Sequence, residues 1–143
     1  MESFKYSEEV NRPWGSYHII DNSDREKFLK TYFPHQKLHG NEVLKFLKIN
    51  PYQRLSWQYH KKRREEWFVV QGPVKAYTSW TNEVYRCSCL DTGDIISIAH
   101  YERHMLESYD TPSIIAEIWV HVNISDPSTE EDIIRVTDNY GRV

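Results

Sequence analysis

Four side chains of this chain have the residue types and the spacing of a metal site. Residues 54–60 alternate as a β-strand does, which places Gln58 and His60 on one face. Five residues after His60, Glu65 opens the next expected strand, and a hairpin can return its carboxylate to the same space. His104 follows a turn and a short apolar strand. Two imidazoles, one carboxylate and one amide oxygen suit zinc, iron, manganese, cobalt or nickel, with open positions for substrate oxygens.

Neither cysteine belongs to this set. Cys87 and Cys89 are two residues apart in a strand-like segment, which does not give the geometry of a disulfide. No second cysteine pair is available to complete a structural zinc site. We therefore expect an open, reactive kind of metal centre and not a closed structural one.

Many short strands are expected to position these side chains. Segments that are aromatic or β-branched and bounded by Asn, Asp, Gly or Pro predict about nine strands, at residues 16–20, 28–33, 43–49, 54–60, 66–71, 74–80, 83–90, 95–98 and 113–122. One helix is expected after Ser128, which forms a capping box with Glu131. Residues 1–10 are expected to be a loose, flexible arm, and residues 11–143 a single all-β sandwich or barrel with a cavity.

The spacing of the candidate ligands resembles the two-part motif of the cupin superfamily. The first part runs through Tyr52, Gln58, His60, Glu65 and Gly72, and the second through Gly93, Ala99, Tyr101, His104 and Ser108. The family pattern has glycine where this chain has Tyr52 and Tyr101. The resemblance implies a double-stranded β-helix, also called a jelly-roll barrel, with the one short helix near the C-terminus.

Three blocks of sequence resemble one cupin family more closely. They are residues 12–17 (RPWGSY), residues 55–70 and residues 132–142, and together they extend the likeness over about residues 11–142. They are similar to the type II phosphomannose isomerase cupin, which also forms the C-terminal part of bifunctional mannose-1-phosphate guanylyltransferase/phosphomannose isomerase enzymes. The chain has neither the length nor the Gly-rich nucleotide loop of the guanylyltransferase half, so the resemblance does not imply nucleotide transfer.

This resemblance implies a metal-dependent isomerase that interconverts mannose 6-phosphate and fructose 6-phosphate. Gln58, His60, Glu65 and His104 would hold the divalent ion, with zinc expected first. The metal would stabilise charge on the enediolate while a proton moves between C1 and C2.

The same resemblance assigns expected roles to charged residues around the metal. Arg63 would neutralise an oxyanion or a phosphate, and Glu117 is the first choice for the general base or acid. Lys45, Arg135 and Arg142 are the basic positions of the family that remain for binding the phosphate.

Departures from the family pattern leave other functions open. Met105 replaces an arginine of the family pattern, and the loss of that arginine is expected to remove a phosphate or oxyanion contact beside the metal. Ser108 replaces an asparagine, and the additional imidazoles His100 and His121 fall near the expected cavity. One alternative is another sugar or nucleotide-sugar reaction, ketoisomerisation or epimerisation, with His100, Tyr101 or His121 as acid and base. Another is a non-catalytic cupin that binds metal and sugar.

Composition excludes several other classes. The 143 residues carry a net charge of -3 with basic residues spread along the chain, which argues against a nucleic-acid or membrane surface. No apolar stretch approaches a transmembrane helix and no signal peptide is visible, so we expect a cytoplasmic protein. We also expect a homodimer, paired through the strands at residues 16–20 or 28–33.

Overall fold

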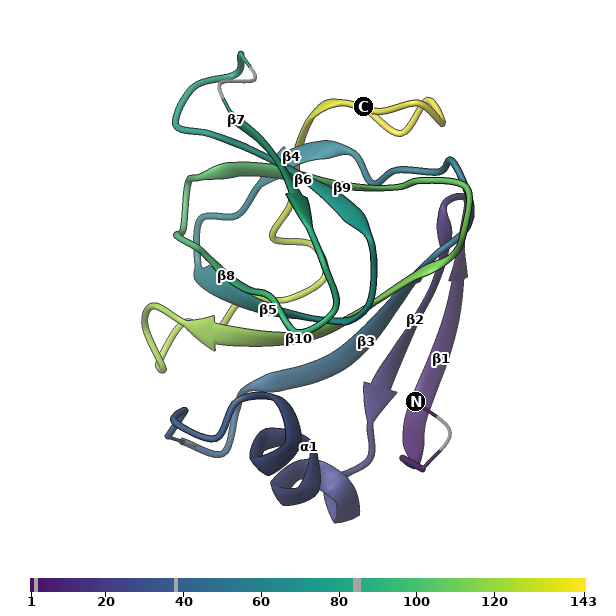
Figure 1. The fold of residues 1–143 in the computed structure, drawn as a ribbon. Coiled ribbons are helices and arrows are strands. Elements are labelled where there is room, and N and C mark those ends of the chain that lie inside the picture. The colour runs from purple at the N-terminus through teal and green to yellow at the C-terminus, as the bar shows by residue number, and fades with distance from the viewer. Residues whose placement is uncertain (2, 38, 84–85) are drawn as a thin grey trace.

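The fold consists of two antiparallel sheets that face each other in a barrel (Figure 1). This computed structural model describes residues 1, 3–37, 39–83 and 86–143. The six-stranded sheet comprises, in spatial order, β1 (Tyr6–Arg12), β2 (Gly15–Ile20), β3 (Val43–Ile49), β10 (Ser113–His121), β5 (Arg63–Gln71) and β8 (Ile95–Ile98). The five-stranded sheet comprises β11 (Ile134–Thr137), β4 (Trp57–Tyr59), β9 (Arg103–Ser108), β6 (Val74–Ser79) and β7 (Arg86–Leu90). The predicted all-β, cupin-type barrel is confirmed.

Strict alternation in β5 determines which of its side chains enter the barrel. Arg63, Glu65, Trp67 and Val69 are buried, while the residues between them are partly exposed. Trp67 and Val69 join the hydrophobic core between the two sheets. The same period of two therefore brings Arg63 and Glu65 into the interior beside the core.

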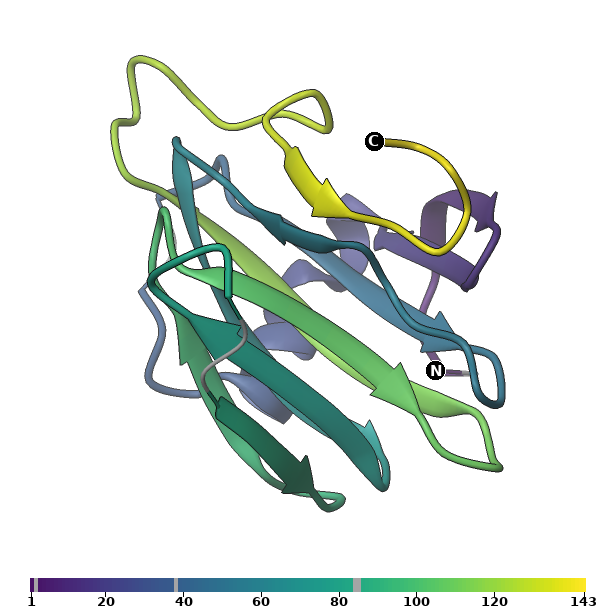
Figure 2. The same ribbon diagram turned by 90° about the horizontal axis from the view of Figure 1, so that it is seen from above.

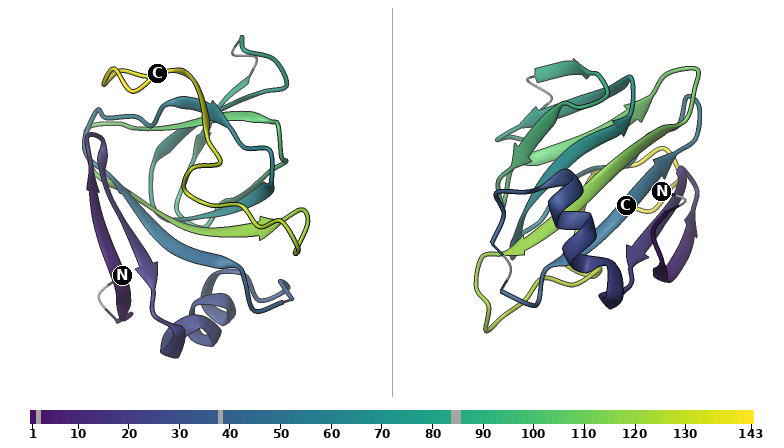
Figure 3. Two further views of the ribbon diagram at one scale, coloured as in Figure 1. Left: turned by 180° about the vertical axis from the view of Figure 1, so that it is seen from behind. Right: turned by 60° about the horizontal axis from the view of Figure 1, so that its bottom comes forward.

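A helix covers the outer face of the six-stranded sheet. The 3-10 turn η1 (Asn22–Asp24) leads into α1 (Arg25–Tyr32), which lies across β3 and β10 (Figure 3). Phe28 of α1 contacts Phe46 of β3 with ring centroids 5.2 Å apart. Because both faces of this part of the sheet are covered, most residues of β3 and β10 are buried.

Two predictions of secondary structure are wrong: the strand expected at residues 28–33 and the helix expected after Ser128. Residues 28–33 were expected to be a strand, but Phe28 and Tyr32 belong to α1 and pack from one face of the helix against the sheet. Aromatic residues favour strands only where they meet a pleated surface, so tertiary packing overrode the local preference. Conversely, no helix follows Ser128, whose hydroxyl donates to Asp132 in a turn that leads to β11.

The N-terminal segment is also more ordered than predicted. Residues 1–10 were expected to be a loose arm, but from Tyr6 onward they form β1, which pairs with β2. The sequence did not predict β9 or β11. Residue 2 of the expected arm, residue 38 of the expected domain, and residues 84 and 85 of the expected strand 83–90 lie outside the described residues.

Neither segment proposed for dimer pairing is a sheet edge. β2 lies between β1 and β3, and residues 28–32 are helical. The homodimer stays a prediction, with β1 as the strand at that edge of the sheet. Among the described helices, none is long and apolar enough to cross a membrane.

Candidate metal centre

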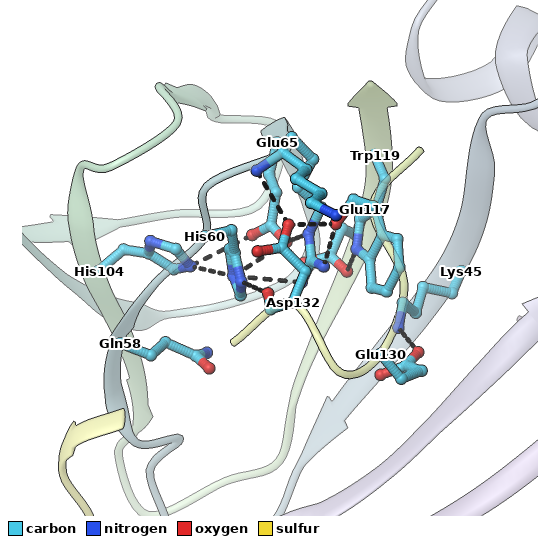
Figure 4. Close-up of polar contacts among 12 residues, drawn as sticks. Lys45, Gln58, His60, Glu65, His104, Glu117, Trp119, Glu130 and Asp132 are labelled. Atoms are coloured by element: carbon cyan, nitrogen blue, oxygen red, sulfur yellow. Dashed lines mark hydrogen bonds and ion pairs between the residues drawn. The ribbon is translucent and has the colours of Figure 1, made fainter. Parts of the chain in front are cut away.

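Neighbouring strands bring three of the four predicted ligands together on the inner wall of the barrel. β4 pairs with β9 so that Gln58 lies opposite His104, and His60 directly follows β4. Glu65 enters from β5 of the other sheet. His60, Glu65 and His104 form a buried group whose ligand atoms all lie within 4.8 Å of one another (Figure 4).

The geometry of this group is that of ligands around a common point. Nε2 of His60 lies 3.0 Å from Nε2 of His104. The two oxygens of Glu65 lie 3.3 Å from the His104 Nε2 and 3.5 Å from the His60 Nε2. All three side chains are at most 3% exposed, so water contributes little to their stabilisation.

Backbone carbonyls fix which nitrogen of each imidazole carries the hydrogen. Nδ1 of His60 lies 2.7 Å from the carbonyl oxygen of Asp132, and Nδ1 of His104 lies 2.9 Å from that of Glu102. A carbonyl only accepts, so both Nδ1 atoms donate, and the Nε2 atoms are the ones that face each other and Glu65. Lone pairs that converge in this way are stabilised by a cation between them, so the donor set fits a divalent metal.

The fourth predicted ligand, Gln58, lies on the same wall but apart from the group of His60, Glu65 and His104. Gln58 is 7% exposed, and its Oε1 accepts a hydrogen bond from Ser56 at 3.3 Å. Figure 4 shows its amide apart from the two imidazoles. Its role as a ligand stays a prediction.

Burial and nearby charges set the protonation of the group. Burial lowers the pKa of His60 to about 3, against the opposing charge of Glu65. Burial raises the pKa of Glu65, but the charge of Arg63 and then the interactions with the two histidines outweigh it and hold this pKa well below its usual range. The imidazole is therefore neutral and the carboxylate ionised at neutral pH, which are the forms that bind metal.

Arg63 is fixed in place by all parts of its guanidinium group. Nε donates to Glu65 at 2.8 Å, and Nη1 donates to the Ser128 hydroxyl at 2.9 Å and the Thr129 carbonyl at 3.2 Å. Nη2 lies 3.2 Å from Nε2 of His60. The guanidinium also lies 3.5 Å over the ring of Trp119. The predicted arginine is thus a rigid positive charge beside the metal ligands.

Glu117 lies on the inner face of β10, as predicted. The sheet register places it opposite Lys45 of β3 and Trp67 of β5. Its two oxygens accept the indole N–H groups of Trp67, at 2.9 Å, and Trp119, at 2.8 Å. Burial and then the charge of Glu65 raise the pKa of Glu117 to about 7, against the charges of Lys45 and Arg63. Its carboxyl can therefore gain or lose a proton near neutral pH.

Lys45 is buried and lies between two aromatic rings and a carboxylate. Its ammonium lies 4.2 Å and 4.1 Å from the ring centroids of Tyr17 and Trp119, respectively, and 2.8 Å from Glu130. Glu130 belongs to the loop before β11, so this ion pair joins β3 to the C-terminal segment (Figure 4).

A single pocket contains most of the predicted site. It encloses about 550 Å³, including solvent at its mouth, and its wall includes Gln58, His60, Arg63, Glu65, Lys45, Glu117, Arg135 and Arg142. We call it the central pocket. The sequence did not assign a role to Arg12, which also lines it. The signal was the RPWGSY block, which was used only to recognise the family.

Two predicted histidines lie elsewhere. His100 is exposed and packs edge-on against Tyr101, outside the residues that line the central pocket. His121 is held by its neighbours, because Nδ1 accepts from the backbone N–H of Ser128 at 3.0 Å and Nε2 lies 2.7 Å from the Asn41 carbonyl. Both nitrogens of His121 are thus occupied in joining loops.

The two departures from the family motif do not alter the pocket wall. Met105 follows His104 in β9 and faces the opposite side of the sheet, where it lines a separate depression with Trp57. The expectation that Met105 removes a contact beside the metal is therefore wrong. Ser108 is buried, with its hydroxyl 3.0 Å from the Ile49 carbonyl and 2.7 Å from the Ser113 hydroxyl, which is a structural role.

A jelly-roll barrel with a buried His, Glu, His group on its inner wall is the architecture of a cupin. The chain belongs to the family described as the C-terminal domain of mannose-6-phosphate isomerase, which it matches over residues 1–138. It is 30% identical over 135 residues to the mannose-1-phosphate guanylyltransferase of Escherichia coli K12. That match covers 94% of this chain but only 23% of the relative.

Solved structures show the same fold at lower identity. The capsular polysaccharide assembling protein CapF of Staphylococcus aureus superposes with a TM-score of 0.64 at 14% identity, over 94% of this chain and 33% of CapF. Oxalate decarboxylase of Lactobacillus farciminis, solved as a formate complex, superposes with a TM-score of 0.61 at 21% identity, over 94% and 34% of the two chains. At these identities the likeness concerns the fold alone.

Proposed function

We propose that this chain is a metal-dependent aldose–ketose isomerase that interconverts mannose 6-phosphate and fructose 6-phosphate. The observation that carries the proposal is the position of a candidate metal-ligand group, His60, Glu65 and His104, next to a buried carboxyl with a pKa of about 7, Glu117. His60, Glu65 and Glu117 all line the central pocket. Membership of the mannose-6-phosphate isomerase C-terminal family supports the choice of substrate.

The three ligands, with Gln58 as a fourth, would hold a divalent ion, which we propose to be zinc. Such an ion supplies a Lewis acid for the oxygens at C1 and C2 of the sugar. Arg63 contributes a fixed positive charge beside Glu65, and its orientation is set by Ser128 and Thr129 before substrate arrives.

Glu117 is the group that moves the proton. In the aldose-to-ketose direction its carboxylate removes the hydrogen from C2, and the resulting carboxylic acid returns a proton to C1, while the C2 hydroxyl proton passes to the C1 oxygen. The indole N–H groups of Trp67 and Trp119 hold the carboxyl in one orientation throughout. Each carboxyl oxygen retains a lone pair for this exchange.

Proton NMR of mannose 6-phosphate in deuterated water tests the proposal. The protein is measured metal-free and then with zinc, manganese, cobalt or nickel. We expect metal-dependent formation of fructose 6-phosphate with deuterium incorporated from solvent, lost in His104→Ala and in Glu117→Gln. His100→Ala is the matched control, because this imidazole is exposed and lies outside the residues that line the pocket. Absence of both product and exchange in folded, metal-loaded protein would refute the isomerase.

A further inference from the structure

The cations that line the central pocket fall into two groups. Lys45 and Arg63 are already neutralised, by Glu130 in one case and Glu65 in the other. The hydrogen-bonding nitrogens of Arg63 also have partners in Ser128, Thr129 and His60. The guanidinium nitrogens of Arg63 are therefore all occupied, whereas Lys45 has its charge paired through a single hydrogen bond to Glu130.

Arg12, Arg135 and Arg142 form the second group and retain donors. No described residue accepts a hydrogen bond from the buried Nε of Arg135. Arg142 uses Nε and Nη2 on Asp138, at 2.8 and 2.7 Å, and Arg12 donates from Nη1 to the carbonyl of Asn11 at 3.4 Å. All three arginines line the central pocket. In agreement with this arrangement, burial and then the charge of Arg142 lower the pKa of Arg135, with a further contribution from Arg12.

The tip of the β1–β2 hairpin holds Arg12 in this position. Arg12 pairs with Gly15 across the turn, and Trp14 between them is buried, with its carbonyl accepting the N–H of Asn50 at 2.9 Å. A Cβ on Gly15 would lie 1.9 Å from the Lys48 carbonyl oxygen, so the turn packs directly on β3. Figure 2 shows the C-terminal segment, which carries Arg142, beside this hairpin.

We infer that Arg12 is a specificity-determining residue that binds the phosphate of the substrate together with Arg135 and Arg142. A phosphate monoester is close to a dianion at neutral pH and has three strongly accepting oxygens. Three arginines with a single carboxylate, Asp138, among them give the surplus charge and the planar donors that such a group needs. The inference deepens the proposed function and rests on it for the identity of the sugar.

Inorganic phosphate is the probe that tests the inference without turnover. Isothermal titration of the full chain compares the wild type with Arg12→Gln and with Lys48→Gln, which removes an exposed charge from β3 next to the same hairpin. Loss of a charge-assisted bond predicts that Arg12→Gln weakens phosphate binding by about tenfold or more. Arg12→Lys keeps the positive charge but loses the planar pair of donors, so its affinity for phosphate is expected to lie between those of the wild type and Arg12→Gln. Equal losses in Arg12→Gln and Lys48→Gln, or none in Arg12→Gln, would overturn the inference.

Kinetics separate this inference from the proposed function. In Arg12→Gln we expect KM for mannose 6-phosphate to rise by about tenfold while kcat changes little, because the arginine binds a part of the substrate that does not react. Arg12 is exposed at the pocket rim, and unchanged circular dichroism will confirm that the variant folds. Arg12-dependent phosphate binding without isomerisation refutes only the proposed function. Isomerisation with an unchanged KM in Arg12→Gln refutes only the inference.

Discussion

The carboxyl groups of Glu65 and Glu117 are buried in the same pocket, yet their pKa values are shifted in opposite directions. Both pKa values are raised by burial, but Glu65 also contacts Arg63 and the two imidazoles, which more than reverse the effect. The pKa of Glu117 is raised further by the negative charge of Glu65. Such a pair divides the work, with one carboxylate permanently ionised to bind a cation and the other able to exchange protons.

The raised pKa of Glu117 predicts how stability depends on pH. Between the ordinary value of 4.5 and about 7 the native state holds a proton that the unfolded state has lost. The corresponding contribution to stability is complete below pH 4.5 and is lost as pH rises toward 7. In metal-free protein, we expect the wild type to lose on the order of 2–3 kcal/mol of unfolding free energy over this range relative to Glu117→Gln.

Urea denaturation at several pH values between 4.5 and 8 measures this difference. Glu83→Gln is the matched control because Glu83 is exposed. If the wild type and Glu117→Gln show parallel pH profiles, Glu117 does not titrate in this range and its predicted role as a neutral-pH base fails with it.

Glu117→Gln is also expected to separate catalysis from binding. Removing a positioned base lowers kcat by about 10²–10⁴-fold, whereas KM for mannose 6-phosphate should stay within a few-fold. Glu66→Gln changes the next carboxylate of β5, which faces the outside and pairs with Arg64, and should leave both constants unchanged. Steady-state kinetics on metal-loaded protein provide the comparison, and a residual kcat near the wild-type value would exclude Glu117 as the base.

Metal binding is expected to stabilise the fold. His60, Glu65 and His104 come from different segments, so an ion held by all three binds the native state alone. At a free zinc concentration of 100 times Kd the gain in unfolding free energy is about 2.7 kcal/mol. Thermal denaturation with zinc and with a chelator should show this gain in the wild type and in His100→Ala, but not in His104→Ala. Equal stabilisation of His104→Ala would place the metal elsewhere.

Two strained tyrosines offer a test of the cupin motif. Tyr52 and Tyr101, which stand where the family pattern has glycine, have φ of 61° and 67°. Tyr52 is 73% exposed, so glycine there relieves left-handed strain with little lost packing and should stabilise the protein by about 0.5–1 kcal/mol. Tyr52→Ala keeps the strain and should gain nothing. Tyr101→Gly relieves the same strain but loses the ring contact with Tyr59, so its unfolding free energy should change little. Chemical denaturation of the three variants would decide the matter.

Local patterns in the sequence determined the class of fold and the core of the metal site. The strands at Val43–Ile49 and Ile95–Ile98 have the predicted bounds, because alternation and flanking turn residues are local signals. The same alternation placed His60 and Glu65 on the inside, and motif spacing added His104. For these residues, position along a strand is enough to decide which face a side chain occupies.

Only the tertiary structure decided which of the charged residues are free to act. Lys45 meets Glu130, 85 residues later, and His60 meets the carbonyl of Asp132, 72 residues later. Residues 28–32 became helical because the outer face of β3 and β10 needed apolar cover. Pairing between distant segments leaves no periodic pattern in the chain. Only the contacts in the folded protein therefore showed that Arg12 and Arg135 keep donors to spare, while the nitrogens of Arg63 are occupied.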